Sequence, residues 1–345
     1  MKPTIRQLSE VTGFSPATIS NALNKKPGVN VETSEKVFRA AREIGYLSQD
    51  GEKKIKLVMY KTNGMIIEDT PFFPMMLDGF QNECRRNGYE MVICYLDRRD
   101  EDFERQVKEL TKEPSSMVAL LGTELLEKDF RYFKDAKCRF LTLDYWNHEM
   151  IFPGVLSNNA DAVTMAIDYL YQKGHRRIGY LRGNFRIKPF RSRAFGYRSA
   201  LISHGLEFQK KYTVTLRTDM DGAYQGMKEY LEKKPALPTA YFADDDMIAL
   251  GAMKALQEKG YRIPEDVSII GFDDLPFCEI TSPRLTSMRV PKQEMGQIAA
   301  RQLITMTEQG CRTVTKIQVC AKFIERESVK DISQVHREGG THGKN

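Results

Sequence analysis

The N-terminal stretch TIRQLSEVTGFSPATISNALN contains the end signal of one short helix and, two residues later, the start signal of a second. Only a tight turn can join two helices that lie so close in sequence. Thr4 and Gln7 have the Thr-x-x-Gln spacing of a capping box, which satisfies backbone N–H groups at a helix start. Gly13 can adopt the left-handed conformation that ends a helix. Ser15 is a favourable N-cap for a second helix, and Pro16 follows at the first helical position, where no N–H is needed. The stretch therefore predicts a helix-turn-helix.

Apolar residues in this region indicate how the helices pack, together with a third helix that Asn30 can cap. The positions expected to be buried are Ile5, Leu8, Val11, Ile19, Ala22, Leu23, Val37, Ala40, Ala41 and Ile44. Three helices with a tight turn between the first two can present the second to the major groove of DNA. An ordinary helical subdomain is the alternative, and the agreement of caps, turn and apolar positions favours the DNA-binding head.

Positive charge is concentrated around this head. The whole chain carries a net charge of +6. Residues 1–61 hold 11 lysines and arginines against 6 aspartates and glutamates, so five of the six net charges lie there. A basic head on a nearly neutral body suits attraction to DNA phosphates. Basic surfaces are common, so this charge supports DNA binding only because it coincides with the helix-turn-helix.

The remaining composition is typical of a water-soluble globular protein. Its 345 residues suggest two or three domains, and no apolar run approaches the roughly 20 residues of a membrane span. The start MKPTIRQ lacks the hydrophobic region of an export signal. Six cysteines and five histidines are dispersed without a metal-binding spacing, so we expect reduced thiols, a cytoplasmic location, no metal and no cofactor.

After the head, short apolar runs alternate with helix-like segments. The runs expected to be strands are 55–60, 90–95, 117–121, 140–143, 178–181, 240–242 and 268–270. Helices are expected near 75–87, 102–112, 161–173, 192–204, 222–233 and 246–259. This alternation predicts an α/β fold with parallel sheets built from βαβ units. The number of elements favours two such sheets side by side over one.

Six strings follow one another along the body: GHRRIGYL, RSRAFGYRSAL, ADDDMIALGAMKAL, VSIIGFDD, SPRLTSM and FIERES. Together with SPATISNALN and VETSEKVFRAAREIGY in the head, they make almost the whole chain similar to the LacI/GalR (lactose-repressor) family of bacterial transcription regulators. The resemblance implies a three-helix head and a body of two periplasmic-binding-protein-like lobes, each with a doubly wound parallel sheet. It also implies that the chain crosses between the lobes near 155–160, 284–290 and 315–320.

The resemblance predicts the domain limits as well. We expect a DNA-binding head at 1–47, a short linker at 48–54, a two-lobed effector-binding and dimerisation domain at 55–329, and a polar tail at 330–345. Within the body, the first lobe is expected at about 55–156 and 289–316, and the second at about 157–285 and 317–329. The tail has no leucine heptad, so we expect no tetramer-forming coil there.

By resemblance, the start of the second helix reads the DNA. The positions that match base-contacting residues are Pro16, Ala17 and Asn21. Asn21 can form two hydrogen bonds with an adenine edge, worth roughly 1–3 kcal/mol of discrimination, whereas Pro16 and Ala17 offer apolar contact to a thymine methyl. Phosphate contacts are expected from Ser15, Thr18, Ser20 and Asn24. For Ser15, helix capping alone is the alternative.

The linker departs from the family. Members carry a hinge helix after the Gly-Tyr pair, with an Ala-Arg-x-Leu pattern whose leucine wedges into the minor groove. Here GYLSQDGEKKIKLVMY lacks that pattern and runs almost directly into the first strand, expected to begin at Ile55, and Gly51 disfavours a helix. We therefore expect the hinge helix to be reduced or absent, with Lys53, Lys54 and Lys56 forming a basic strap on the DNA backbone.

Polar residues follow several predicted strands, where open α/β sheets bind ligands. By resemblance, Asp144, Arg193, Asp245 and Asp273 match effector-contacting positions of the family. An arginine and carboxylates suit a ligand with many hydroxyl groups, because charged groups form strong hydrogen bonds. The resemblance to the family, more than these residues, favours a carbohydrate or a related metabolite as the effector, with a nucleobase-type corepressor as the second choice.

Three aromatic residues are candidates for the same site. Trp146, the only tryptophan, lies two residues after Asp144 and is expected to stack on a sugar face. Phe72 and Phe73 match a first-lobe loop that contacts the ligand in the family. Packing between the lobes is an equally good interpretation of these aromatic residues.

Asp245 is a second departure, because the family usually has asparagine there. Together with Asp244, Asp246 and Asp273, it makes the expected cleft acidic, which suits a ligand with many hydroxyls or with positive charge. Alternatively, Asp244 or Asp246 caps the helix that starts at Met247, and for Asp246 we favour this capping role.

These observations favour a ligand-controlled transcription regulator, expected to be a repressor that binds a pseudo-palindromic operator as a homodimer. One alternative is a cytoplasmic sugar-binding receptor with the same body, which the DNA-binding head disfavours. Another is a sugar-processing enzyme with such a head. The sequence contains no nucleophile elbow, glycine-rich phosphate loop or metal signature, so we expect neither enzymatic activity nor a membrane partner.

Overall fold

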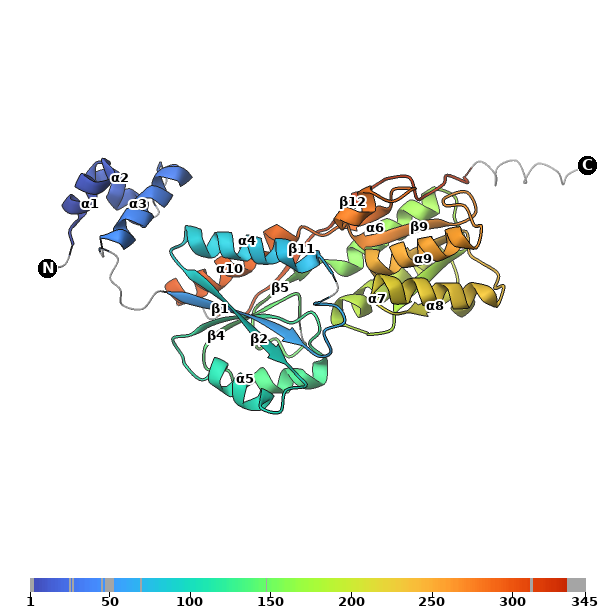
Figure 1. Cartoon of the computed structure of the whole chain (residues 1–345), viewed down its shortest axis with the longest axis horizontal. Helices are drawn as coiled ribbons and strands as arrows, with labels where there is room; N and C mark the ends of the chain where they lie inside the picture. Colours follow the sequence, from blue (N-terminus) through green and yellow to red (C-terminus); the bar gives the residue numbers. More distant parts are fainter. Residues whose placement is uncertain are drawn as a thin grey trace, which may run out of the picture.

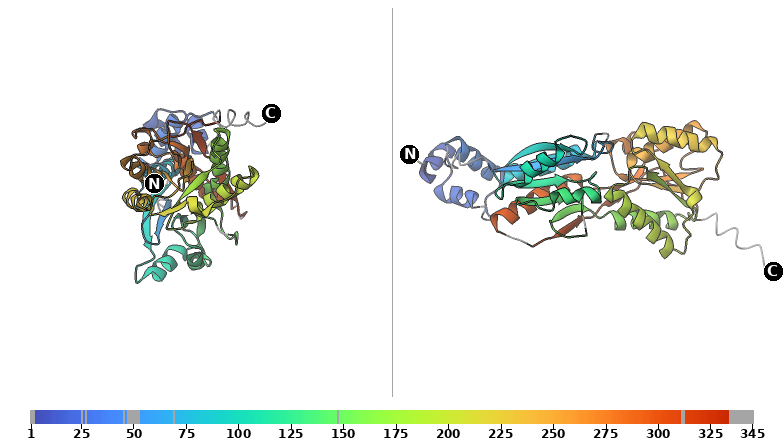
Figure 2. Two further views of the ribbon diagram at one scale, coloured as in Figure 1. Left: turned by 90° about the vertical axis from the view of Figure 1, so that its right-hand side faces the viewer. Right: turned by 90° about the horizontal axis from the view of Figure 1, so that it is seen from below.

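A small helical head and two α/β lobes follow one another along the long axis of the molecule (Figure 1; Figure 2, right). The computed structural model describes residues 3–24, 26, 28–44, 46, 53–68, 70–146, 148–310 and 313–333. Both lobes contain one six-stranded, mainly parallel sheet between helices. The predicted α/β fold with two doubly wound sheets is confirmed.

The head consists of three helices, α1 (Ile5–Thr12), α2 (Pro16–Leu23) and α3 (Val31–Glu43). The predicted capping box is present, because Thr4 and Gln7 each accept a backbone N–H from the other. Gly13 ends α1 with a φ of 72°. Ser15 caps α2 by accepting the N–H of Thr18 at 3.1 Å.

The core of the head contains most of the expected residues, with Leu8, Ile19, Ala22, Val37, Ala40 and Ala41 buried. The expected cap of α3 is also present, since the side chain of Asn30 accepts the N–H of Thr33 at 2.7 Å. The prediction for Val11 is wrong, because this side chain is 58% exposed. Successive steps of three residues fall short of a full turn of 3.6 residues, so Val11 is rotated by about 120° from Ile5.

The first lobe is built on the sheet order β11-β5-β4-β3-β1-β2, in which all pairs are parallel. Its strands are β1 (Lys54–Lys61), β2 (Glu90–Asp97), β3 (Met117–Leu121), β4 (Arg139–Leu143), β5 (Gly154–Ser157) and β11 (Lys316–Val319). Its helical segments are α4 (Phe72–Arg86), α5 (Phe103–Thr111), η1 (Glu127–Phe133) and α10 (Lys292–Glu308). Alternate residues of β1 face different layers: Leu57 packs in the core with α4 and α10, and Val58 in the core with α5.

The second lobe is built on the order β12-β10-β9-β8-β6-β7, in which only the β10–β12 pair is antiparallel. Its strands are β6 (Ile178–Gly183), β7 (Thr213–Leu216), β8 (Ala240–Ala243), β9 (Ser268–Asp273), β10 (Thr286–Arg289) and β12 (Lys322–Ile324). Its helical segments are α6 (Asn159–Gln172), α7 (Lys188–Ser203), η2 (Lys210–Tyr212), α8 (Met220–Glu232), α9 (Asp246–Glu258) and η3 (Pro276–Glu279).

The chain passes between the two sheets three times, after β5, after β10 and after β11. β11 pairs with β5, so residues 317–319 belong to the first sheet and not, as expected, to the second lobe. Five strands (β5, β7, β10, β11 and β12) and helix α10 were not among the predicted elements. Each sheet therefore includes strands from distant parts of the sequence.

Helices α4 and α10 approach each other so closely that their backbones meet. A methyl group on Gly79 of α4 would lie 2.0 Å from the carbonyl oxygen of Gln293, and one on Gly296 of α10 would lie 2.0 Å from that of Met76. Glycine at both positions is therefore what allows this contact. The pairing fixes α10 against the helix that begins at the cleft.

The predicted linker and tail lie largely outside the described residues, which omit 47–52 and 334–345. The hinge-helix prediction falls on this part. Ile55 lies in a strand, as predicted. Two of the three lysines expected to form the basic strap lie in this strand as well. Lys54 and Lys56 are part of β1, where Lys54 forms an ion pair with Glu90 at 3.4 Å. Within the described ranges, no helix has the length and apolar character needed to cross a bilayer.

Candidate ligand-binding cleft and DNA-facing helix

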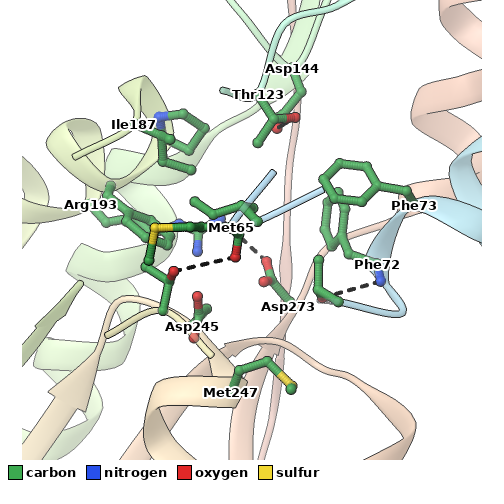
Figure 3. Close-up of a pocket in the computed structure, with 15 residues that line it drawn as sticks. Met65, Phe72, Phe73, Thr123, Asp144, Ile187, Arg193, Asp245, Met247 and Asp273 are labelled. Carbon is green, nitrogen blue, oxygen red and sulfur yellow. Dashed lines mark hydrogen bonds and ion pairs between the residues drawn. The ribbon is translucent and has the colours of Figure 1, made fainter. Parts of the chain in front are cut away.

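A cleft lies between the lobes, and both of them line it (Figure 3). From the first lobe come Met65, Ile66, Thr70, Phe72, Phe73, Thr123 and Asp144. From the second come Ile187, Pro189, Phe190, Arg193, Thr218, Asp245, Met247 and Asp273. The space between these atoms, open solvent included, is about 440 Å³. Six of the seven predicted effector residues thus come together, and only Trp146 is outside this group.

Arg193 lies at the centre of the polar groups in the cleft. It extends from α7 and is buried, with its Nε donating to Asn159 at 2.8 Å and one Nη donating to Asp273 at 3.3 Å. The other Nη donates to the backbone carbonyl of Asp244. The guanidinium lies 3.7 Å above the centre of the Phe272 ring. These contacts fix the plane of the guanidinium, so a ligand would meet a preorganised donor.

Asp144 faces Arg193 from the end of β4, in the first lobe. One of its oxygens accepts the hydroxyl of Thr123 at 2.7 Å. Burial raises the pKa of Asp144 to about 6, since the charged form loses its hydration. Its φ of 57° lies in the left-handed region, and Asp273 has a φ of 105°. Two of the candidate carboxylates therefore sit on unfavourable backbone, as often found where a site is held for binding.

Asp245 and Asp273 form the acidic side of the cleft in the second lobe. Asp245 caps α9, because its side chain accepts the N–H of Ile248 at 2.8 Å. Burial raises the pKa of Asp245 well above its usual range, and the nearby Asp273 adds to this. Burial also raises the pKa of Asp273, although Arg193 and Lys292 oppose the rise. The expected role of Asp246 as the cap is wrong, since Asp245 fills it.

Asp244 and Asp246 point away from the cleft into the second lobe. Asp244 accepts hydrogen bonds from the Tyr180 hydroxyl, from the N–H of Gly183 at 2.8 Å and from Arg186. Asp246 accepts the N–H of Leu275 at 2.8 Å and the hydroxyl of Ser287 at 2.7 Å, and burial raises its pKa to about 7. Of the three consecutive aspartates, only Asp245 lines the cleft, so the site is less acidic than the sequence indicates.

Phe72 and Phe73 serve both of the roles considered for them. They begin α4, contact each other edge to face with ring centres 5.2 Å apart, and line the cleft. They also pack between the lobes, because Lys292 of α10 lies 5.4 Å from the centre of the Phe72 ring and donates to the carbonyl of Asp273. This buried lysine links the first lobe to the second.

Glu124 is a functional candidate that the sequence did not reveal. Its buried carboxylate accepts five backbone N–H groups of one loop. These donors are Thr62, Asn63 and Gly64 on one oxygen, at 2.9–3.1 Å, and Ile66 and Ile67 on the other, at 2.9 and 3.1 Å. The loop brings Met65 into the cleft, where its carbonyl accepts the hydroxyl of Thr218 from the second lobe at 3.4 Å. No motif marks such a contact, because loop and carboxylate lie about sixty residues apart.

Trp146 lies beside the cleft and not in it. It lines a neighbouring hollow, and the ammonium of Lys316 lies 5.7 Å from the centre of its ring. Within the described residues, no three histidine, cysteine or acidic side chains are grouped as metal ligands. The cleft as a whole offers an arginine donor, carboxylate acceptors and aromatic faces to a small polar molecule.

The predicted DNA-contacting residues lie along the whole of α2, from its N-cap Ser15 to its C-cap Asn24. Ser15, Pro16, Ala17 and Asn24 are exposed, whereas Thr18, Ser20 and Asn21 are half-buried. The side chain of Asn24 donates to the carbonyl of Ser20 at 2.8 Å, and the Ser15 and Thr18 hydroxyls are 2.9 Å apart. The Asn21 amide makes no hydrogen bond with the residues that the structure describes.

Comparison with known proteins identifies relatives over nearly the whole chain. The periplasmic binding protein-like domain family matches residues 167–329. The ribose operon repressor of Haemophilus influenzae is 27% identical over 94% of this chain and 98% of its own length. A probable repressor of Bacillus subtilis, ExuR, is 26% identical over 96% and 99%. These relatives are transcriptional repressors and not enzymes.

Solved structures give a consistent result. A complex of the transcriptional regulator CelR with cellobiose superposes with a TM-score of 0.71 at 25% identity, covering 94% of this chain and 99% of that one. The lac repressor dimer bound to operator and an anti-inducer superposes with a TM-score of 0.70 at 20% identity, covering 96% and 100%, which supports the fold.

Proposed function

The chain belongs to the LacI family of transcription regulators, and on this premise we propose that it is a DNA-binding repressor controlled by a small molecule in its inter-lobe cleft. It binds a pseudo-palindromic operator as a homodimer, and its effector is a sugar. It acts in the cytoplasm, in keeping with free cysteines such as Cys84 and Cys278. One observation supports the proposal most directly. The same chain contains a capped helix-turn-helix and a cleft lined by Arg193 and three aspartates.

The DNA-binding half of the proposal rests on α2. Its exposed N-terminal turn carries small side chains, so the helix can enter the major groove without steric conflict. Asn21 has an amide with no partner among the described residues, and it is the side chain best suited to read an adenine. A homodimer presents two such helices to half-sites roughly 34 Å apart.

The effector half rests on the chemistry of the cleft. Arg193 offers N–H donors, and Asp144, Asp245 and Asp273 offer acceptors within one small space. Hydroxyl groups both donate and accept, so a polyol can satisfy all of these groups at once. Phe72 and Phe73 add flat apolar faces for the C–H surface of a sugar ring.

Coupling between the two halves follows from the position of the cleft. A ligand that contacts both lobes favours one relative position of them over another, provided that its affinity for the two states differs. The head joins the first lobe, so a change in lobe position alters the spacing of the two heads in a dimer. Operator affinity then changes with ligand occupancy.

The first test is selection of DNA by the purified full-length chain from a pool of random duplexes. The expected result is enrichment of an inverted repeat, and Asn21→Ala should lose at least tenfold in discrimination at an adenine position. Glu113→Gln, an exposed change in the body, serves as the control. Enrichment of no sequence would favour the alternative of a sugar-binding receptor with this body.

The second test measures release from the selected operator as sugars are added. We expect Arg193→Ala to lose the ligand response while operator affinity stays within about threefold of wild type, because α2 is unchanged. A response that persists in Arg193→Ala would contradict the assignment of the cleft. Turnover of any sugar would contradict the proposed regulator.

A further inference from the structure

A second hollow adjoins the cleft and shares Asp144 and Pro189 with it. It is larger, with about 820 Å³ of space against about 440 Å³. Lys188 and Arg191 at the start of α7 line one side, and Trp146 and Lys316 line the other. The two spaces therefore meet at Asp144 and Pro189, and a ligand that spans both would pass these residues.

The second hollow is lined by three cationic side chains, Lys188, Arg191 and Lys316, against two carboxylates. Glu127 is the carboxylate here besides Asp144, and it already binds Lys188 at 3.8 Å and His148 at 2.9 Å. Arg191 and Lys316 form no ion pair with any residue that the structure describes. The Nε of Arg191 donates only to the backbone carbonyl of Arg186, at 3.4 Å.

The basic character continues along the rim. A third, smaller hollow shares Glu127, Lys188 and Arg191 with the second and adds Lys128 and Arg186. Arg186 is held by Asp244, so its charge is balanced. Lys128 forms no ion pair among the described residues. Among the described residues, Arg191 and Lys316 of the second hollow and Lys128 of the third thus lack a carboxylate partner.

The cleft and the second hollow have opposite electrostatic characters. In the cleft, three aspartates (Asp144, Asp245 and Asp273) surround the single cation Arg193. Repulsion from the three carboxylates would therefore outweigh the attraction of Arg193 for an anionic group placed there. In the second hollow, the same group would meet ammonium and guanidinium donors, and those donors form strong charge-assisted hydrogen bonds with anions. A ligand that spans both would be oriented by its charge.

We infer that the effector is a sugar carrying a carboxylate or phosphate, whose hydroxyl groups occupy the cleft and whose anionic group lies between Lys188, Arg191 and Lys316. This assignment rests on the proposed function. Trp146 lines the second hollow, with its ring beside Lys316, and offers the ligand a flat surface there.

The test is calorimetric titration of the full-length protein with two matched series of sugars. One series is glucose, glucuronate and glucose 6-phosphate, and the other is galactose, galacturonate and galactose 6-phosphate. We expect an anionic member to bind at least tenfold more tightly than the neutral sugar of its series. Comparison of acid with phosphate within a series identifies which anion the hollow accepts.

The variant that tests the placement is Lys188→Gln/Arg191→Gln, which removes the charges of the half-buried Lys188 and the exposed Arg191. We expect it to reduce the preference for the anionic sugar to threefold or less while binding of the neutral sugar is unchanged. Lys210→Gln/Lys233→Gln, two exposed lysines elsewhere on the second lobe, is the matched control and should leave the preference intact.

The outcomes separate this inference from the proposed function. A neutral sugar that binds as tightly as its anionic counterparts overturns the inference and leaves the sugar-controlled repressor standing. An anionic preference that survives in the double variant overturns the placement in the second hollow. Binding of no member of either series contradicts both the anionic effector and the proposed sugar control.

Discussion

Replacing Glu124 by glutamine tests whether one buried carboxylate organises the wall of the cleft. In the wild-type protein, its two oxygens accept five N–H groups of the loop at 62–67, and three of these hydrogen bonds are fully buried. The glutamine amide has only one oxygen, and its NH₂ group would face N–H donors. The amide nitrogen replaces either the acceptor of Ile66 and Ile67 or the acceptor shared by the N–H groups of residues 62–64. At least two of the loop donors therefore lose their acceptor.

The expected loss of stability follows from these donors. Each buried N–H left without a partner costs about 1–3 kcal/mol, so Glu124→Gln should lower the free energy of unfolding by about 2–6 kcal/mol. Local detachment of the loop would limit the loss to the lower part of this range, because the loop can then reach water. Either response would displace Met65 from the cleft, and affinity for the effector should fall with it.

Two measurements distinguish these responses. Urea unfolding followed by the fluorescence of Trp146, the only tryptophan, reports the stability of the first lobe. Hydrogen exchange at 62–67 reports opening of the loop itself. Glu113→Gln removes an exposed carboxylate with no side-chain partner in the described structure, and it should change stability by less than about 0.5 kcal/mol. If Glu124→Gln behaves like this control in both measurements, the organising role of Glu124 is refuted.

Three further predictions concern the cleft and the helix packing behind it. Because the pKa of Asp144 is raised from 3.8 to about 6, its ionisation lowers the folding stability as pH rises through this interval. Asp144→Asn should therefore stabilise the protein at pH 7.5 by on the order of 2–3 kcal/mol. In urea titrations, this gain should disappear near pH 4. Asp245→Asn should retain the cap on Ile248 and raise the thermal midpoint, whereas Asp245→Ala loses the cap and should cost about 1 kcal/mol more than Asn; equal midpoints for the two variants would contradict the capping role. Gly79→Ala should cost about 3 kcal/mol by separating α4 from α10, while Gly226→Ala, which meets only the end of a leucine side chain at 3.0 Å, should be close to neutral in the same assay.

The head and most of the strands could be predicted because their signals are local. Caps such as Thr4 and Ser15 act within three residues, and a buried strand such as β3 is a continuous apolar run. Helix α10 was missed because its sequence, KQEMGQIAARQLITMTE, spreads polar residues and a glycine around the helix. Its position depends on contact with α4 through Gly79 and Gly296, which no local pattern contains.

The cleft could be predicted only in part. Asp144, Asp245 and Asp273 could be predicted because each follows a predicted strand, and parallel strands bring their carboxyl ends to one edge of a sheet. The three consecutive aspartates could not be assigned separately, since which one caps α9 depends on where the helix begins. Glu124 was missed for a related reason, because its role depends on a loop that pairs with it only in the folded chain.

The crossing of the chain between the lobes also determines the order in which the head and the two lobes can fold during synthesis. The head has all of its core residues before position 47 and can fold early. The first lobe needs α10 and β11, which end at Glu308 and Val319, so the apolar side of α4 stays uncovered until nearly the whole chain has been synthesised. Premature termination late in translation would therefore release a folded head on a body that cannot complete either sheet.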